Sequence, residues 1–200
     1  MKHTNSKPYG LILAGGYSKR MGQDKALLTF HQKPQLEHIH DMLLPFCDNV
    51  FVSTRPDQAE LTPYKKFPQL HDLDEFSQAG PLGGIISAMK SYPGASWIVM
   101  ACDLPFVTSE TIHYLIERRK SELSATAYIS ATDQLPEPLC AIWEGHFLPD
   151  ILALLKEGVK CPRKILIKSN IQLLTQQHQN WLINVNDPQE YKQFKYSISY

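Results

Sequence analysis

Short apolar runs of strand length recur along the chain, and segments with the spacing of a helix face lie between them. The apolar runs are continuous rather than alternating, as in strands that are buried on both faces of a sheet. None is much longer than about eight residues, far below the roughly twenty that a membrane span needs. The predicted strands span residues 10–14, 49–54, 96–101, 125–130 and 181–185.

The intervening segments carry apolar residues at helical spacing. Leu36, Ile39 and Leu43 form one such stripe. A later helix begins at Thr108 or Ser109, either of which can cap a helix N-terminus with its hydroxyl. The predicted helices span residues 34–46, 80–92, 108–120, 145–157 and 162–169.

The alternation of strands and helices predicts an α/β fold. We expect three layers: a doubly wound, mostly parallel sheet with helices on both of its faces. Prolines and polar residues at 54–69 and 131–138 mark loops rather than domain boundaries. A chain of 200 residues can bury one sizeable core but is short for two, so a single domain over residues 1–200 is expected.

Composition narrows the classes of function. Twenty Lys and Arg residues balance twenty Asp and Glu residues, so no net charge attracts nucleic acid or an anionic membrane, and a small-molecule partner fits better. The four cysteines form no CxxC pair, which argues against a disulfide framework or a structural zinc and suits a reducing cytoplasm. The eight histidines form no HExxH pattern, so they indicate no zinc site either.

A glycine-rich segment directly follows the first predicted strand. Residues 13–26 read LAGGYSKRMGQDKA. Its adjacent glycines allow a tight turn whose backbone N–H groups bind an anion. Lys19, Arg20 and Lys25 could neutralise a triphosphate bound there. The Walker pattern and the GxGxxG pattern are both absent, which argues against P-loop hydrolysis and against NAD binding.

A second glycine segment and an aspartate follow other predicted strands. Residues 79–89 read AGPLGGIISAM, a Gly-Pro turn that opens a helix whose first residues are small enough to approach a base or a sugar. Asp103 comes just after the buried strand at 96–101. Doubly wound sheets bind ligands at the carboxyl ends of their strands, so Asp103 is a candidate ligand for Mg²⁺.

These motifs resemble those of the molybdenum cofactor guanylyltransferases. Residues 13–26 match the signature LAGGxSxRMGxDKA, and residues 80–85 resemble a GPLxGI turn that follows an acidic residue. Cys102–Pro105 matches the motif CDxP, residues 184–190 resemble a closing NxNxPEE segment, and residues 138–143 lie where the family has a strand near the acceptor. The resemblance covers nearly the full length and implies a Rossmann-like nucleotidyltransferase fold.

The resemblance implies transfer of GMP from GTP to the terminal phosphate of molybdopterin or its molybdenum-loaded form, with Mg²⁺ as cofactor and pyrophosphate as product. It also implies other proteins of cofactor biosynthesis or molybdoenzyme maturation as partners. Arg20, Lys25 and Asp103 would be catalytic, with Asp103 as the metal ligand. Nucleotide contacts would come from Leu13, Ala14, Gly15, Gly16, Lys25, Ser53, Asp72, Gly80 and Asp103, and acceptor contacts from Asn184 and Asn186.

The chain departs from the family pattern at two places. Ser53 stands where the family often has an Asn that contacts guanosine, and Gln78 with Ala79 stands where PG is usual. Another nucleotidyltransferase, specific for CTP or for a sugar phosphate, is therefore one alternative, and a noncatalytic nucleotide-binding module is another. Cytidylyl relatives tend to read LAAG, so the LAGG of this chain favours GTP. Lys25 and Asp103 together favour an enzyme over a module.

Overall fold

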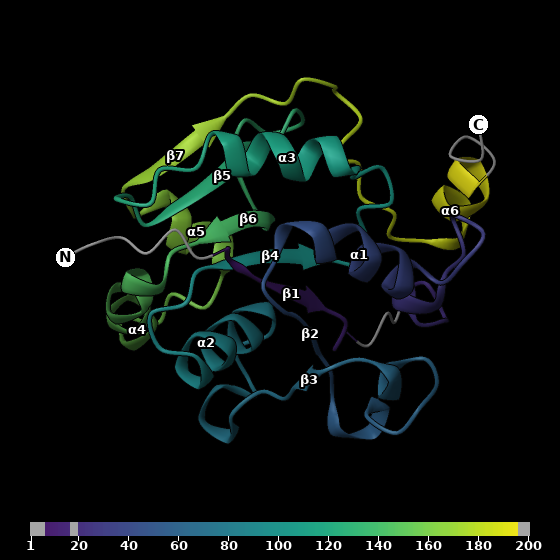
Figure 1. Cartoon of the computed structure of the whole chain (residues 1–200), viewed down its shortest axis with the longest axis horizontal. Helices are drawn as coiled ribbons and strands as arrows, with labels where there is room; N and C mark the ends of the chain where they lie inside the picture. The colour runs from purple at the N-terminus through teal and green to yellow at the C-terminus, as the bar shows by residue number, and fades with distance from the viewer. Residues whose placement is uncertain (1–6, 17–19, 196–200) are drawn as a thin grey trace.

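The computed structural model describes residues 7–16 and 20–195 of the chain. Within these residues, seven strands form one sheet in the order β3-β2-β1-β4-β6-β5-β7 (Figure 1). β6 is antiparallel to β4 and β5, while the other neighbouring strands pair in parallel. The strands are β1 (Tyr9–Leu13), β2 (Val50–Ser53), β3 (Gln69–Leu70), β4 (Trp97–Ala101), β5 (Ala125–Ile129), β6 (Pro136–Trp143) and β7 (Ile171–Leu174).

Each predicted helical segment contains a helix. Thr108 is the N-cap of α3, because its hydroxyl accepts a hydrogen bond from the Thr111 N–H. No helix in the described ranges is long and apolar enough to cross a membrane. The α-helices of these ranges are α1 (Gln35–Leu43), α2 (Pro81–Ser91), α3 (Ser109–Glu117), α4 (Leu148–Lys156), α5 (Pro162–Ile167) and α6 (Pro188–Lys195).

Helices cover both faces of the sheet (Figure 1). α1 and α3 pack on one face, and α2, α4 and α5 pack on the other. Successive side chains of a strand point to opposite faces, so Leu11 belongs to the apolar cluster beneath α2 and Ile12 to the cluster beneath α1. Both side chains are fully buried. The predicted three-layer, doubly wound fold is confirmed, and burial on both faces explains the continuous apolar runs.

The predicted strand over residues 181–185 is wrong. This segment begins with a turn and continues without regular structure, and the edge strand paired with β5 is β7 instead. The segment is apolar because Trp181 and Val185 are buried. Trp181 packs edge-on against Tyr128, with ring centroids 5.9 Å apart. Packing against aromatic side chains of β5 and α3, rather than pairing in a sheet, accounts for its composition.

β6 begins inside a segment that was predicted to be a loop, residues 131–138. Proline is rare inside a sheet, so Pro136 and Pro138 led to the prediction of a loop where this strand begins. Because β6 runs antiparallel to β4, Cys140 pairs with Met100 near the carboxyl end of β4. The first residues of β6 therefore lie at the edge of the sheet where the other strands end.

Candidate active site

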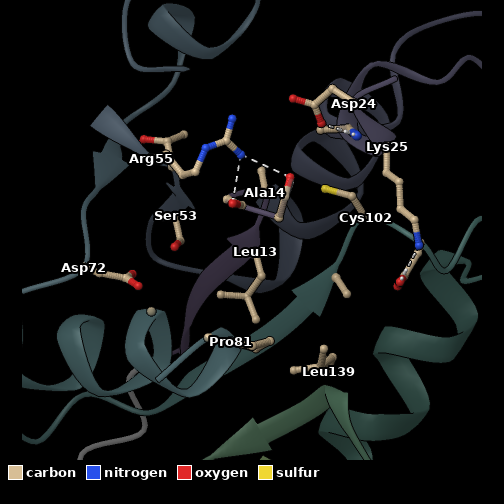
Figure 2. A pocket seen from close by; sticks show the side chains of 18 of the residues that line it. Leu13, Ala14, Asp24, Lys25, Ser53, Arg55, Asp72, Pro81, Cys102 and Leu139 are labelled. Atoms are coloured by element: carbon tan, nitrogen blue, oxygen red, sulfur yellow. Dashed lines mark hydrogen bonds and ion pairs between the residues drawn. The ribbon is translucent and has the colours of Figure 1, made fainter. Parts of the chain in front are cut away.

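The carboxyl ends of β1, β2, β3 and β4 open onto one cleft of about 700 Å³ (Figure 2). The helix that follows β1 covers one face of the sheet, and the helix that precedes β4 covers the other. Since β1 and β4 are neighbours, the winding of the sheet reverses between them. Doubly wound sheets bind ligands at this kind of switch point, and the volume is in the usual range for small-molecule sites.

The glycine loop after β1 lines the cleft. Neither Gly15 nor Gly16 has a positive φ that would require glycine. A Cβ on Gly15 would make only ordinary contacts with Arg55 and Ser53, and one on Gly16 would meet nothing within 4 Å. In the described part of the chain, neither glycine N–H has a hydrogen-bond acceptor. The fold itself does not need glycine here, whereas an anion that approaches the backbone closely would.

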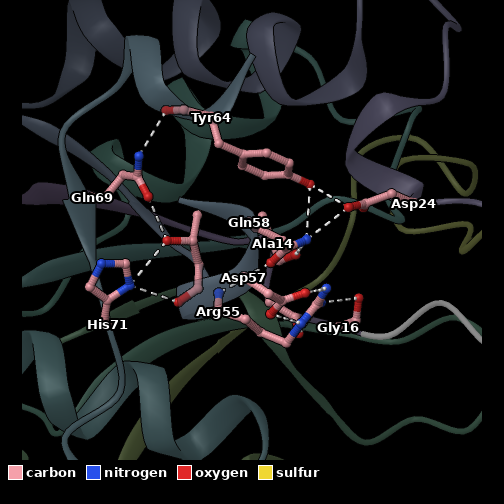
Figure 3. A network of polar contacts seen from close by, with 11 residues as sticks. Ala14, Gly16, Asp24, Arg55, Asp57, Gln58, Tyr64, Gln69 and His71 are labelled. Carbon is pink, nitrogen blue, oxygen red and sulfur yellow. Dashed lines mark hydrogen bonds and ion pairs between the residues drawn. The ribbon is translucent and has the colours of Figure 1, made fainter. Parts of the chain in front are cut away.

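Asp24 fixes the far end of this loop (Figure 3). Its Oδ1 accepts a hydrogen bond from the Ala26 N–H at 3.1 Å and so caps the short turn that begins at Lys25. Its Oδ2 accepts from the Tyr64 hydroxyl at 2.6 Å and from Gln58 Nε2 at 2.8 Å. Burial and the neighbouring Asp24 carboxylate raise the pKa of Tyr64, so the hydroxyl stays protonated and donates. These bonds orient the turn that carries Lys25.

Lys25 joins three parts of the chain that are far apart in sequence. Its Nζ donates to Asp103 Oδ2 at 3.2 Å and to Asn186 Oδ1 at 2.8 Å. The Val185 N–H donates to the Asp103 carbonyl at 2.9 Å. The Glu190 carboxylate, on the first turn of α6, accepts from the Asn186 N–H at 2.6 Å. The glycine loop, the end of β4 and the C-terminal segment therefore meet at one ammonium group.

Asp103 presents a carboxylate oxygen that no described residue of the chain contacts as a donor. Oδ2 accepts from Lys25, while Oδ1 has no hydrogen-bond donor among the residues that the structure describes. The side chain is 28% exposed and lines the cleft. In the same residues, no group of three or more His, Cys, Asp or Glu side chains could hold a metal by itself. A cation at Asp103 would need further ligands from a bound substrate.

Ser53 and Asp72 lie against the start of α2 at another part of the cleft (Figure 2). A Cβ on Gly84 would lie 2.8 Å from Ser53 Oγ, and a Cβ on Gly83 would lie 2.8 Å from Asp72 Oδ2. Both distances are shorter than real Cβ contacts. Gly80, the N-cap of α2, has a φ of 58°, which favours glycine. The glycines of this turn thus let a hydroxyl and a carboxylate approach the helix backbone.

The Asp72 carboxyl is half-buried, and burial raises its pKa above the ordinary value, an effect that the neighbouring His71 opposes. A carboxylate that has lost part of its water is stabilised by hydrogen-bond donors. Asp72 can therefore gain from a ligand that brings N–H or O–H groups into the cleft.

Among the residues that the structure describes, all but one of those predicted for the site line this cleft. Asn184 is the exception, because it is exposed and lies outside the lining, so its contact with an acceptor stays a prediction. Lys19, the other cation predicted for the loop, and Ser18 of the loop signature lie outside the described residues. The predicted residues in the lining are Leu13, Ala14, Gly15, Gly16, Arg20, Lys25, Ser53, Asp72, Gly80, Asp103 and Asn186.

Sequence reasoning missed the side chains between β2 and β3. Arg55 and Asp57 line the cleft, and Gln58 and Tyr64 reach Asp24 from the same segment. Its prolines and polar residues indicated only a loop. The one available signal was position, since Arg55 lies two residues beyond a buried strand, at the edge where ligands bind.

Comparison with known protein families gives a match over most of the chain. The family described as "MobA-like NTP transferase domain" matches residues 10–173. The chain is 39% identical to the "Molybdenum cofactor biosynthesis bifunctional protein" of Synechocystis sp. over 92% of its own length and 53% of that protein, so it spans about half of this relative. It is 31% identical to the "Probable molybdenum cofactor guanylyltransferase" of Bacillus mycoides, over 97% of this chain and 98% of that protein.

A solved structure shares the fold. The molybdopterin-guanine dinucleotide biosynthesis protein A from Archaeoglobus fulgidus superposes with a TM-score of 0.74 at 21% identity. The match covers 94% of this chain and 97% of that chain. Identity this low shows a common fold, and the sequence relatives carry the assignment to a family.

Proposed function

Because the chain belongs to the MobA-like NTP transferase family, we propose that it transfers GMP from GTP to the terminal phosphate of molybdopterin, with or without bound molybdenum. The observation that carries the proposal is the Lys25 ammonium, which bonds both the Asp103 carboxylate and the Asn186 amide. Motifs that resemble a nucleotide site and an acceptor site thus meet at one cation, as transfer between two bound substrates requires.

The reaction is a displacement at the α-phosphorus of GTP. An oxygen of the acceptor phosphate forms a bond to this phosphorus, the bond from the phosphorus to the bridging oxygen breaks, and pyrophosphate leaves. The chemistry needs positioning and neutralisation of charge rather than a protein nucleophile. The N–H groups of Gly15 and Gly16 would hold the phosphates, Arg20 and Lys25 would neutralise the departing pyrophosphate, and Asn186 would contact the acceptor.

The residues present fit a magnesium ion. Mg²⁺ prefers hard oxygen ligands and is commonly held by one or two carboxylates together with substrate phosphates. Asp103 offers such an oxygen in Oδ1, and the bond from Lys25 to Oδ2 fixes the orientation of the carboxylate. When bound, Mg²⁺ would supply positive charge that offsets the negative charge of the phosphates.

Asp72 and Ser53 would contact the nucleoside. Guanine carries two adjacent donors, N1–H and its 2-amino group, whereas cytosine presents a single amino donor. The two oxygens of a carboxylate can accept an adjacent pair of donors. A half-buried Asp72 would therefore favour GTP over CTP. The Ser53 hydroxyl could bond a ribose hydroxyl or the base.

The free cysteines support the cytoplasm as the compartment. Cys47, Cys102, Cys140 and Cys161 are all unpaired. Unpaired thiols persist where the surroundings are reducing. Contact with other proteins of cofactor biosynthesis or molybdoenzyme maturation belongs to the same proposal.

Nucleotide preference and turnover test the proposal together. Calorimetry measures the affinity for GTP, CTP, ATP and UTP, and a pyrophosphate assay follows turnover with Mg²⁺ and molybdopterin. We expect GTP to bind most tightly and pyrophosphate to appear only when GTP and molybdopterin are both present. Equal affinities for GTP and CTP would contradict the guanine assignment. Binding of GTP without turnover would contradict the transferase and favour a noncatalytic module.

A further inference from the structure

Arg55 holds the glycine loop by its carbonyl oxygens. Its Nη1 donates to the carbonyl oxygen of Gly15 at 2.9 Å and to that of Gly16 at 3.1 Å (Figures 2 and 3). The arginine follows β2, and the glycines follow the neighbouring strand β1, so one guanidinium ties together the ends of two parallel strands.

The guanidinium is itself held in place from the other side. Its Nε and Nη2 donate to Asp57 Oδ1 and Oδ2, both at 3.0 Å, in a two-pronged pair. The Arg55 backbone N–H donates to Gln58 Oε1 at 3.1 Å. A planar fork of donors can serve a carboxylate and two carbonyls at once, which a lysine ammonium on a flexible stem cannot do with the same geometry. The hydrogen bond from Arg55 also lowers the pKa of the Asp57 carboxyl, so the pair stays charged.

The carbonyl contacts set the orientation of the backbone N–H group between the two glycines. A trans peptide is planar, and its N–H points opposite to its C=O. With the Gly15 carbonyl on Arg55, the Gly16 N–H points away from the guanidinium. This N–H is one of the two loop donors without an acceptor in the part of the chain that the structure describes.

We infer that Arg55, oriented by Asp57, is a positioning residue that presents the N–H donor of Gly16 to the triphosphate of the nucleotide. The inference rests on the proposed function for the nature of the ligand. It differs from direct phosphate binding, in which the Arg55 guanidinium would itself be the ligand and its pairing with Asp57 would compete with the phosphate.

Two variants and three probes test this role. Arg55→Lys keeps the positive charge but loses the planar set of guanidinium donors. Asp57→Asn keeps Arg55 but weakens the two-pronged pair that orients its guanidinium. Calorimetry would measure the affinity of each variant for GTP, for inorganic triphosphate and for guanosine. Arg118→Lys is the matched control, because Arg118 is an exposed arginine at the end of α3, away from the cleft lining. Thermal melts would report folding.

We expect Arg55→Lys to weaken GTP and inorganic triphosphate about tenfold and Asp57→Asn to weaken both about threefold, with guanosine changed less than about twofold. Tighter triphosphate binding by Asp57→Asn would overturn the inference in favour of direct phosphate contact. Equal losses for guanosine and triphosphate would reduce Arg55 to a structural role, and unchanged triphosphate binding would remove the role altogether. If Arg55→Lys does not fold, the Asp57→Asn comparison decides alone.

The inorganic triphosphate probe separates this inference from the proposed function. If Arg55→Lys weakens triphosphate binding but the parent protein transfers no GMP, the inference about Arg55 holds and the proposed function is wrong. If the parent protein transfers GMP but neither the Arg55 nor the Asp57 variant changes triphosphate binding, the proposed function holds and the inference about Arg55 is wrong.

Discussion

At the scale of single residues, Lys25 combines two contacts that a surface lysine would not make. It is 18% exposed, and its ammonium bonds a carboxylate at the end of β4 and an amide near the C-terminus. A surface ion pair contributes less than about 1 kcal/mol to stability. A cation held beside a developing negative charge contributes far more to a reaction rate, so kinetics separates the two roles.

Lys25→Ala should lower turnover roughly a hundredfold at saturating GTP while the affinity for GTP falls much less, because the lost charge acts mainly on the departing pyrophosphate. Steady-state kinetics, calorimetry and a thermal melt would separate chemistry, binding and folding. Lys33→Ala is the matched control, since Lys33 forms a surface ion pair with Asp41. Turnover within about threefold of the parent would show that Lys25 is not catalytic.

Asp103→Asn should lower turnover by about two orders of magnitude or more, because an amide is a poorer ligand for Mg²⁺ than a carboxylate of the same size. Stability should change little, since the amide oxygen can still accept from Lys25. The measurement is turnover across a range of Mg²⁺ concentrations, with Asp41→Asn as a surface control. Near-normal turnover would leave Asp103 as a turn residue without a catalytic role.

Some site residues could be predicted from the sequence because their chemistry depends on position along a strand. Asp103 lies two residues beyond the end of β4, and Gly15 and Gly16 lie two and three residues beyond the end of β1. Arg55 and Tyr64 could not be predicted in the same way. Their roles depend on bonds to residues 39 or 40 positions away, and such pairings follow from the fold rather than from a local pattern.

At the scale of elements, the two glycine turns serve different purposes. Gly84 in α2 is required by the protein, since its Cβ would crowd Ser53 Oγ and lie 3.0 Å from Leu13 Cδ2. Gly16 after β1 is not, since its Cβ would meet nothing within 4 Å. The sequence shows both in glycine-rich segments, and only their surroundings distinguish packing from ligand binding.

This difference predicts opposite results for two alanine variants. Gly84→Ala should lower the melting temperature despite a gain in helix propensity of about 1 kcal/mol, because Ser53 and Leu13 must shift. Gly16→Ala should melt like the parent but bind GTP about tenfold more weakly, because its methyl group occupies space left for the ligand. Each variant is the control for the other. A Gly16→Ala protein that binds GTP normally would contradict the role of the loop.

A pair of histidines links the loop before α1 to the segment after Asp103. The rings of His31 and His38 stack with centroids 3.7 Å apart, and His31 Nε2 lies 2.9 Å from the Pro105 carbonyl oxygen. Burial, followed by the charges of His31 and Lys33, lowers the pKa of His38 from 6.5 to about 4. Burial also lowers the pKa of His31.

These shifts give stability a definite dependence on pH. Between the folded pKa of about 4 and the unfolded value of 6.5, the unfolded chain binds more protons at His38, so stability falls as the pH falls through this window. We expect melting temperatures to decrease from about pH 6.5 toward pH 4, and His38→Gln to decrease less steeply. His113→Gln, at an exposed position on α3, is the control. Parallel curves for parent and His38→Gln would contradict this contribution.

Elements differed in how far the sequence predicted them. β1, β2, β4 and β5 are buried on both sides, and their continuous apolar runs place them within a residue or two. The edge strand β7 has little buried surface, and two of the first three residues of β6 are prolines. The pattern at 181–185 matched a strand because Trp181 and Val185 fill the core from an irregular segment. An apolar run therefore indicates that a segment is buried, and it does not show that the segment pairs in a sheet.

At the scale of the whole molecule, the fold explains why the site lies where it does. Parallel winding brings the ends of β1 to β4 to one edge, and the C-terminal segment completes the cleft by bonding Asn186 to Lys25. The class of fold could be predicted from alternation alone. The closure by the C-terminal segment could not, because it depends on a contact across 161 positions.

Isotope-labelled GTP tests guanylyl transfer most directly, because it follows the α-phosphorus to its product. The purified protein would be incubated with Mg²⁺, molybdopterin and GTP labelled either at the α-phosphorus or at the γ-phosphorus, and the products would be separated. If the protein transfers GMP, the α label enters the dinucleotide product and the γ label appears only in pyrophosphate. An α label that stays in free GMP or GDP, or a γ label that reaches the acceptor, would contradict guanylyl transfer.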